Sequence, residues 1–326
     1  MGTWDGKNPT LAECEQLVNN SSDVDFEYVA EGRANAVFSI WTVNSGGERK
    51  RQLEGTLLRV PKETPHITPC DYKTLHDFHE NVVEKAVDSQ FLVSQKLSRI
   101  TEHVAAIMNA KRMKDGKRDK DDGSVIKSGY AMFMEDMRES TGYSVLEFKP
   151  KWLAQSPIAP RDAKRCRTCA REAYRNSLKR AEGKKTSIPI CPLGLLSSDE
   201  KIVAQTIERL APEWPEVDRD RLAQAFKDTQ IFEELRKLQD EGDPGTTLLD
   251  NPSDPQFGLA MTLRDCTCFV RMPDDTAKTI EIKLADVDKK NWEEKQSYWR
   301  ESHENLVKDG WYTNDMDGET DCQLNR

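Results

Sequence analysis

Three short stretches of alternating apolar and polar residues constrain the fold of this chain more than any other feature. They are "FEYVAE" (26–31), "NAVFSIWTV" (35–43) and "GTLLRVPK" (55–62), and short polar segments separate them. Alternation with a period of two places successive side chains on opposite faces of a sheet, and short polar turns join antiparallel strands. The pattern therefore predicts a meander of three antiparallel strands near the N-terminus.

Helical and strand patterns then follow one another along the rest of the chain. Helical periodicity covers 70–87 and continues through 91–111, and strand patterns cover 128–137 and 143–152. Three helical patterns between Pro157 and Pro255 indicate an α-helical insertion, over roughly 163–181, 198–210 and 218–241. Strand patterns return at 259–272 and 278–287, and a last helix is expected from about 288 to 307.

This order of elements predicts an α+β fold with two lobes. We expect a small β-rich N-terminal lobe over residues 1–133 and a larger mixed C-terminal lobe over residues 134–326. The α-helical insertion lies in the second lobe, at about 157–255.

The charge balance limits the ligands that the whole surface can attract. Lys and Arg total 48 against 57 for Asp and Glu, which gives a net charge of −9. A general nucleic-acid or membrane-surface protein is therefore disfavoured, and an anionic ligand requires a local basic pocket. The N-terminal sequence lacks a signal-peptide pattern, and no run of about 18 apolar residues occurs, so we expect the protein in the nucleus or cytoplasm. We also expect a monomer. In that setting eight cysteines are expected as buried thiols or metal ligands.

A tight turn at Gly32, in "VAEGRANAVF", is the first candidate binding element. Small residues at such a turn let backbone N–H groups approach phosphate oxygens, although a plain hairpin has the same pattern. Arg59 and Lys62 follow in the third strand, where a kinase-like fold places a cation over nucleotide phosphates.

Lys149 and Lys151 form a second candidate, in "VLEFKPKW". Residues two apart in a strand share a face, so their ammonium groups would repel one another unless an anion lies between them. Because lysines also protect exposed strand edges, a solvated edge is the alternative. The apolar neighbours Val145, Leu146 and Trp152 favour the anion.

Asp265 is the third candidate, because we expect it in the middle of the apolar strand "AMTLRDCTCFVRM". An ionised carboxylate there needs a metal, a cation or hydrogen bonds, which favours a general base or a metal ligand. An ion pair with Arg264 is the alternative.

Asp286, Lys290 and Tyr298 are predicted to share one face of the last helix. Asp286 near the helix start suits Mg²⁺, and Lys290 and Tyr298 suit phosphate oxygens. An amphipathic surface helix would have the same spacing.

Cys166 and Cys169 have the spacing of half a zinc site, and Cys191 is a third candidate ligand. No fourth ligand is apparent, and two ordinary thiols on a helix are the alternative. Arg165, Arg167 and Arg171 around them form a basic helical face, suited to phosphate or to water.

Four motifs, in this order, resemble those of the inositol-pentakisphosphate 2-kinase family, in particular its fungal members. They are "AEGRAN" (30–35), "EFKPKW" (147–152), "RDCT" (264–267) and "DVDKK" (286–290). The resemblance implies a two-lobed fold distantly related to protein kinases. It also implies transfer of the γ-phosphoryl group of ATP to the 2-hydroxyl of inositol 1,3,4,5,6-pentakisphosphate, giving inositol hexakisphosphate (phytate).

The resemblance also implies roles for particular residues. The residues expected to cover the ATP phosphates are Glu31, Gly32, Arg33, Ala34, Asn35 and Arg59. Glu135 and Met137 are expected beside the adenine. The inositol phosphates would contact Lys149, Lys151, Lys290 and Tyr298, and we add Arg167 from the basic helical face. Asp265 would be the base, with Lys149 as the second catalytic residue, and Asp286 and Asp265 would ligate Mg²⁺.

Two other functions stay open. A kinase of this build could act on another phosphorylated small molecule or on protein, although the "HRD" and "DFG" signatures of protein kinases are absent from the sequence. A noncatalytic inositol-polyphosphate-binding protein is the other alternative. A pure polyanion binder would gain from losing Asp265 and Asp286, so their presence argues against it.

Overall fold

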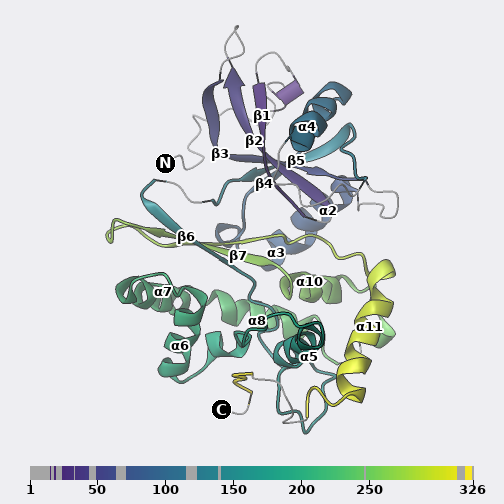
Figure 1. Ribbon diagram of the computed structural model, residues 1–326, viewed down its shortest axis with the longest axis vertical. Coiled ribbons are helices and arrows are strands. Elements are labelled where there is room, and N and C mark those ends of the chain that lie inside the picture. Colours follow the sequence, from purple (N-terminus) through teal and green to yellow (C-terminus); the bar gives the residue numbers. More distant parts are fainter. Residues whose placement is uncertain are drawn as a thin grey trace. The chain divides into compact units, whose positions relative to one another are not determined.

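The protein is an α+β protein in the computed structural model (Figure 1), which describes residues 15, 18–19, 24–32, 34–43, 49–63, 71–114, 123–138, 141–245, 247–313 and 320–324. The chain divides into two compact units. The first is Met1–Asn81 with Val93–Arg138, and the second is Val82–Leu92 with Glu139–Arg326. None of the helices in the described ranges is long and apolar enough to cross a membrane.

The first unit is built on an antiparallel sheet with the strand order β1-β2-β3-β5-β4. The predicted meander is confirmed, because β1 pairs with β2 and β2 with β3, both antiparallel. Helix α4 contacts β1, and α2 contacts β4 and β5. The strands and helices are β1 (Val24–Glu31), β2 (Asn35–Val43), β3 (Arg49–Pro61), α2 (Tyr72–Phe78), β4 (Gln95–Ile100), α4 (Glu102–Lys114) and β5 (Gly129–Glu135).

Fully buried apolar side chains fill the space between this sheet and α4. They include Phe26, Phe38, Ile40, Leu58 and Met108, none of which is exposed. Side chains from alternate positions of the strands thus supply one face of the core, as the sequence pattern predicts.

The helix expected over 91–111 is wrong in its first half, because Gln95–Ile100 forms β4. This strand pairs along its whole length with β5 and is an edge strand of the sheet. A six-residue segment is too short for periodicity to separate strand from helix. The predicted lobe boundary at residues 133/134 falls inside β5.

The second unit contains the sheet β6-β7-β8, which is antiparallel throughout. Most of its helices come between β6 and β7 in the sequence, where the insertion was predicted, and Figure 1 shows them to one side of the sheet. Gln230 has a positive φ of 51°, so the helix expected over 218–241 is two helices, α7 and α8. The strands and longer helices are β6 (Tyr143–Phe148), α5 (Arg167–Ala181), α6 (Glu200–Leu210), α7 (Glu216–Thr229), α8 (Ile231–Glu241), α10 (Pro255–Leu263), β7 (Thr267–Pro273), β8 (Glu281–Ala285) and α11 (Trp292–Lys308). The π-helix His79–Val83 contains the boundary between the two units, which lies after Asn81 in the sequence. The other short segments are α3 (Glu84–Ala86), the 3-10 helices Ser89–Phe91 and Pro192–Leu196, and α9 (Thr247–Asp250).

Two of the sequence motifs lie in connections and not in the elements predicted for them. Asp265 is not in a strand: α10 starts at its N-cap Asp254 and runs to Leu263, and β7 starts only at Thr267. Asp286 and Lys290 are not on the last helix, because α11 begins at Trp292 with Asn291 as its N-cap. An apolar run such as 259–263 suits a buried helix as well as a strand, which explains the first error.

Candidate active site

Three lysine side chains from two separate segments meet at the carboxylate of Asp265. The Nζ atom of Lys151 donates to Oδ1 at 3.1 Å, and that of Lys290 donates to Oδ2 at 3.3 Å. Lys149 Nζ donates to the backbone carbonyl of Asp265 at 2.7 Å and lies 3.7 Å from its Oδ1. Asp265 therefore stands at the centre of a cationic cluster at the C-terminal end of α10.

Asp286 joins this cluster through Lys149. Its Oδ2 accepts a hydrogen bond from Lys149 Nζ at 3.2 Å, so one ammonium group bridges the carboxylates of Asp265 and Asp286. We call Lys149, Lys151, Lys290, Asp265 and Asp286 the Asp265 cluster. The side chain of Lys290 is 12% exposed, and the other four are 36% to 51% exposed.

The prediction that Lys149 and Lys151 lie on one face of a strand is wrong, yet their two ammonium groups do converge on Asp265. Strand β6 ends at Phe148, and Lys151 has a left-handed backbone with φ of 59°. Asp286 also has a positive φ, of 57°, just after β8. Lys is rarely found in this conformation, so the surrounding contacts hold the backbone of the site in a strained form.

The electrostatics of the cluster favour an ionised Asp265. Burial by itself would raise the pKa of Asp265, but the charges of Lys290, Lys151 and Lys149 outweigh it and lower the pKa to about 2. The carboxylate is therefore negative at neutral pH, and each lysine has an anionic partner before any ligand binds.

Gln239 of α8 braces the backbone around the cluster. This side chain is 1% exposed, and its Nε2 donates to the carbonyls of Lys151 (3.0 Å) and Leu263 (3.4 Å). Its Oε1 accepts from the N–H of Leu153 at 3.0 Å. One amide thus connects the turn that carries Lys151 to the helix end that carries Asp265.

Arg264, next to Asp265, is anchored in the interior. Its guanidinium donates to Asp243 Oδ2 at 2.6 Å and to the carbonyl of Gln239 at 3.0 Å, and it lies 3.7 Å from the ring centre of Trp152. Both members of the Arg264–Asp243 pair are at least 94% buried. Arg264 therefore pairs with Asp243, and the predicted alternative of an ion pair with Asp265 is wrong.

Arg167 and Tyr298 take part in other contacts. Arg167, the first residue of α5, donates to the Tyr312 hydroxyl at 3.3 Å and lies 5.0 Å from the ring centre of Trp152. Tyr298 is 53% exposed on α11 and accepts a hydrogen bond from Arg171 at 2.7 Å. No hydrogen bond or ion pair among the described residues joins either one to the Asp265 cluster, and their assignment to the substrate stays a prediction.

In the first unit, the end of β1 is fixed by ion pairs around Glu31. Its carboxylate lies 3.3 Å from Lys62 Nζ and also pairs with Arg112 of α4. Burial would raise the pKa of Glu31, but these two cations lower it. The N–H of Gly32 donates to the carbonyl of Asn35 at 2.9 Å, which closes the turn; Arg33 lies outside the described residues.

The Arg59 side chain of β3 contacts Asn35, the residue at which this turn ends and β2 begins. With its oxygen toward Arg59, the Asn35 amide accepts from the guanidinium at 2.6 Å and donates to the Tyr72 hydroxyl at 2.8 Å. The N–H of Lys62 donates to the carbonyl of Ala34 at 2.8 Å. The turn is thus held against β3 by side chains and by the backbone.

Glu135 is the last residue of β5, and Met137 lies two positions after it. The N–H groups of Glu135 and Asp136 donate to the carbonyls of Ser94 and Gly55, both at 2.9 Å. Neither N–H is therefore available to a ligand unless the sheet opens. Met137 is 3% exposed.

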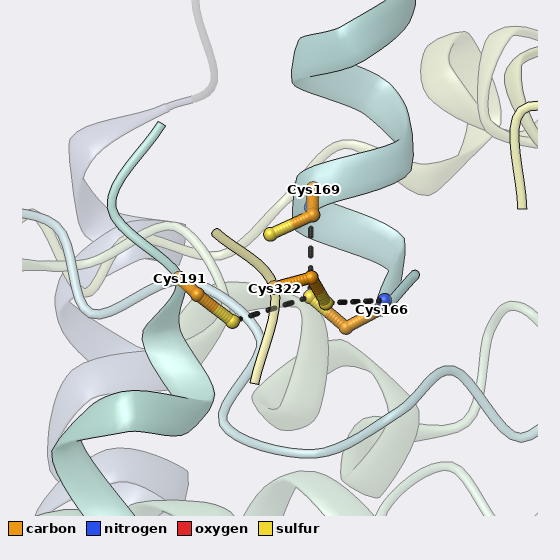
Figure 2. Close-up of side chains that lie close together, drawn as sticks. All are labelled: Cys166, Cys169, Cys191 and Cys322. Carbon is orange, nitrogen blue, oxygen red and sulfur yellow. Dashed lines mark hydrogen bonds between the residues drawn. The ribbon is translucent and has the colours of Figure 1, made fainter. Parts of the chain in front are cut away.

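Cys166 and Cys169 lie at the start of α5, as expected, and the third candidate and one further cysteine lie beside them. Cys191 and Cys322 join them, and all four are buried (Figure 2). Hydrogen bonds from the other three cysteines lower the pKa of Cys322, whereas the hydrogen bond with Cys166 raises that of Cys169. The fourth cysteine was not apparent in the sequence, because nothing in the pattern of residues 320–324 connects it to residue 166.

Sequence analysis missed the residues that support the site. Gln239 had a usable signal, because it lies on the same helical face as Ile231 and Leu235, and a polar residue on an apolar face needs buried partners. Arg264 and Asp243 had no such signal, since their pairing depends on how α8 and α10 pack.

The Asp265 cluster has the composition of a site for a phosphorylated ligand, on an α+β fold. A model of the inositol-pentakisphosphate 2-kinase family matches residues 28–305, so the chain belongs to this family. The inositol-pentakisphosphate 2-kinase of Yarrowia lipolytica is 37% identical over 169 residues, which are 51% of this chain and 53% of that protein. That of Eremothecium gossypii is 29% identical over 167 residues, 50% of this chain and 54% of that protein. The chain thus spans about half the length of the curated relatives it matches.

Proposed function

We propose that this chain transfers the γ-phosphoryl group of ATP to the 2-hydroxyl of inositol 1,3,4,5,6-pentakisphosphate, giving inositol hexakisphosphate. The observation that carries the proposal is the convergence of Lys149, Lys151 and Lys290 on Asp265 beside Asp286. Family membership supplies the class of reaction.

The three lysines are assigned to the phosphates of the inositol ring. Their ammonium groups already lie around one carboxylate, so a ligand with several phosphates can take over several of these ion pairs at once. Positioning and charge neutralisation, more than covalent help, are what phosphoryl transfer requires from a protein.

Asp265 is assigned to the accepting hydroxyl. With a pKa of about 2 it is a weak base while three lysines surround it. When substrate phosphates draw those lysines away, the pKa of the carboxylate rises, and it can then orient the 2-hydroxyl and accept its proton. The Lys149 ammonium contacts the carboxylates of both Asp265 and Asp286 and partly neutralises their negative charge.

The donor set around Lys149 fits a divalent cation. Carboxylate oxygens of Asp265 and Asp286 are hard ligands of the kind that Mg²⁺ prefers, and the Lys149 ammonium already bridges them as a cation would. When bound, Mg²⁺ supplies neutralisation of negative charge on the transferring phosphates.

The residues of the first unit are assigned to ATP. The turn from Glu31 to Asn35, held by Lys62 and Arg112, and the Arg59 guanidinium are suited to the nucleotide phosphates. Since the N–H groups of Glu135 and Asp136 are used within the sheet, the backbone of Met137 is the better candidate for the adenine edge.

Product analysis tests the proposal. The purified chain is incubated with Mg²⁺, ATP and the pentakisphosphate, and the inositol phosphates are separated by anion-exchange chromatography. We expect a hexakisphosphate peak that disappears in Asp265→Ala and persists in Lys289→Gln, an exposed neighbour without a described contact to the cluster. Tight binding of the pentakisphosphate without conversion would instead support a noncatalytic binding protein.

A further inference from the structure

The connection between β8 and α11 carries Asp286 and Lys290 of the Asp265 cluster but has no regular structure of its own. Residues 286–291 belong to no helix or strand. Asp286 also has a positive φ of 57°, a conformation that surrounding contacts must hold in place. The positions of both side chains therefore depend on what fixes this connection to the rest of the second unit.

Thr262 of α10 supplies such a contact. Its side chain is completely buried, and its hydroxyl Oγ1 donates to the carbonyl of Asp288 at 2.9 Å. Asp288 lies midway in sequence between Asp286 and Lys290, and Asp265 lies just beyond the end of α10. One hydroxyl group therefore links the connection that carries Asp286 and Lys290 to the helix end that carries Asp265.

This hydrogen bond differs from those of two other helical threonines in the second unit. The hydroxyl of Thr206 donates to the carbonyl of Ile202, and that of Thr229 donates to the carbonyl of Ala225, in each case one turn earlier in the same helix. Such a bond satisfies the hydroxyl locally and joins no second segment. The Thr262 hydroxyl instead reaches a residue 26 positions away in sequence.

Thr262 complements the buried amide of Gln239. The Gln239 side chain connects the turn that carries Lys151 to the same end of α10, through the carbonyls of Lys151 and Leu263. Thr262 connects the remaining segment of the Asp265 cluster to that helix end. The Nζ atom of Lys290 lies 3.3 Å from Asp265 Oδ2, so a small movement of the connection would break this contact.

Apolar packing is the other explanation for a buried threonine at this position. Neighbouring residues of α10 are buried, and so is Val287 in the connection, so the Thr262 methyl group also contributes to packing. A buried hydroxyl, however, needs an acceptor, whereas valine fills nearly the same space without one. The two explanations differ in whether the hydroxyl or the methyl group matters for the reaction.

We propose that Thr262 is a positioning residue for phosphoryl transfer, whose hydroxyl sets the place of Asp286 and Lys290 relative to Asp265. This inference rests on the function proposed above, which assigns those three residues to the metal, the substrate phosphates and the accepting hydroxyl. Thr262 is fully buried and acts only through the Asp288 carbonyl. Without its hydroxyl the connection moves, and the Asp286 carboxylate and the Lys290 ammonium leave the positions that the reaction requires.

Two substitutions separate the hydroxyl from the methyl group. Thr262→Val keeps the shape and removes the hydroxyl, whereas Thr262→Ser keeps the hydroxyl and removes the methyl group. We expect kcat per folded molecule to fall about tenfold or more in Thr262→Val and to stay within about threefold of wild type in Thr262→Ser. Thermal unfolding of each variant gives the folded fraction at the assay temperature. A packing role predicts the reverse, with normal kcat in Thr262→Val and reduced kcat in Thr262→Ser, and that result would overturn the proposal.

Ligand-free crystal structures of wild type and of both variants test the same inference without reference to turnover. The distance from Lys290 Nζ to Asp265 Oδ2 should exceed about 4 Å, the limit of an ion pair, in Thr262→Val and stay near 3.3 Å in Thr262→Ser. An unchanged distance in Thr262→Val would contradict the positioning role.

Two further outcomes are separable. If Thr262→Val does not fold, Thr262→Ala takes its place, because Thr262→Ser and Thr262→Ala differ only in the hydroxyl. Wild-type protein that makes no hexakisphosphate would count against the proposed function and not against the hydrogen bond. In that case the Lys290 to Asp265 distances in the variants still decide whether Thr262 positions the connection.

Discussion

At the scale of single residues, the state of Asp265 is set by its neighbours. Lys290, Lys151 and Lys149 each lower the pKa of this carboxyl group, and together they outweigh the opposite effect of burial. Lys290 has the largest of these three effects and the least exposed side chain of the cluster. Removal of Lys290 should therefore change the pKa of Asp265 more than removal of Lys149 or Lys151.

We expect Lys290→Gln to raise the pKa of Asp265 from about 2 toward its ordinary value in the metal-free, ligand-free protein. Carbon-13 NMR of the carboxyl group during an acid titration measures this directly. A carboxyl with a lowered pKa stabilises the fold above its unfolded-state value and loses that contribution as pH falls through the folded-state value. Wild-type stability should therefore decline more than that of the variant between about pH 4 and pH 2. Lys289→Gln is the matched control, and an unchanged Asp265 titration in Lys290→Gln would contradict the assignment.

At the scale of elements, α8 and α10 hold the cluster in place. Gln239 connects α8 to the Lys151 turn and to Leu263, and Asp243, just after α8, pairs with Arg264 at the end of α10. The position of Asp265 therefore depends on a buried ion pair one residue away.

Removing Asp243 tests whether the buried Arg264–Asp243 pair stabilises this part of the fold. Asp243→Ala leaves the buried Arg264 guanidinium without its anion, and breaking such a pair costs about 3 to 5 kcal/mol in the free energy of unfolding. Urea denaturation measures the loss. Glu241→Ala breaks an exposed pair with Lys237 on the same helix and should cost less than about 0.5 kcal/mol. Similar costs for the two variants would mean that the Arg264–Asp243 pair does not brace the site.

The sequence predicted many of the strands and helices, but not all of their boundaries or the contacts between them. The meander at 26–62 and the Lys149, Asp265 and Asp286 motifs follow from local patterns, and the structure brings those three residues together. The strand β4, the helix α10 and the actual start of α11 depend on pairing and packing, which short apolar runs do not encode. The same holds for Cys322, which is 156 residues from Cys166.

At the scale of the whole molecule, the two proposed ligands use different compact units. Arg59 belongs to the first unit, and Lys151 belongs to the second. Substitutions in one unit should therefore act on one ligand at a time.

We expect Arg59→Gln to raise the KM for ATP about tenfold or more and to leave the affinity for the pentakisphosphate unchanged, because one charge-assisted contact is lost. Lys151→Gln should weaken pentakisphosphate binding by a similar factor with little effect on the KM for ATP. Steady-state kinetics and calorimetry without nucleotide separate the two effects. Equal effects of either substitution on both ligands would show that the assignments are wrong.

The internal pairing of the three lysines also sets a threshold for anions. A free anion must compete with carboxylates that are already in place, and one phosphate can replace only one of those partners. A small anion such as inorganic phosphate thus gains little by entering, whereas a ring bearing several phosphates displaces several partners in one event. The preference for one anion over another therefore grows with the number of phosphates that the ligand carries. Asp265 and Asp286 produce this preference, although each carboxylate by itself repels every anion.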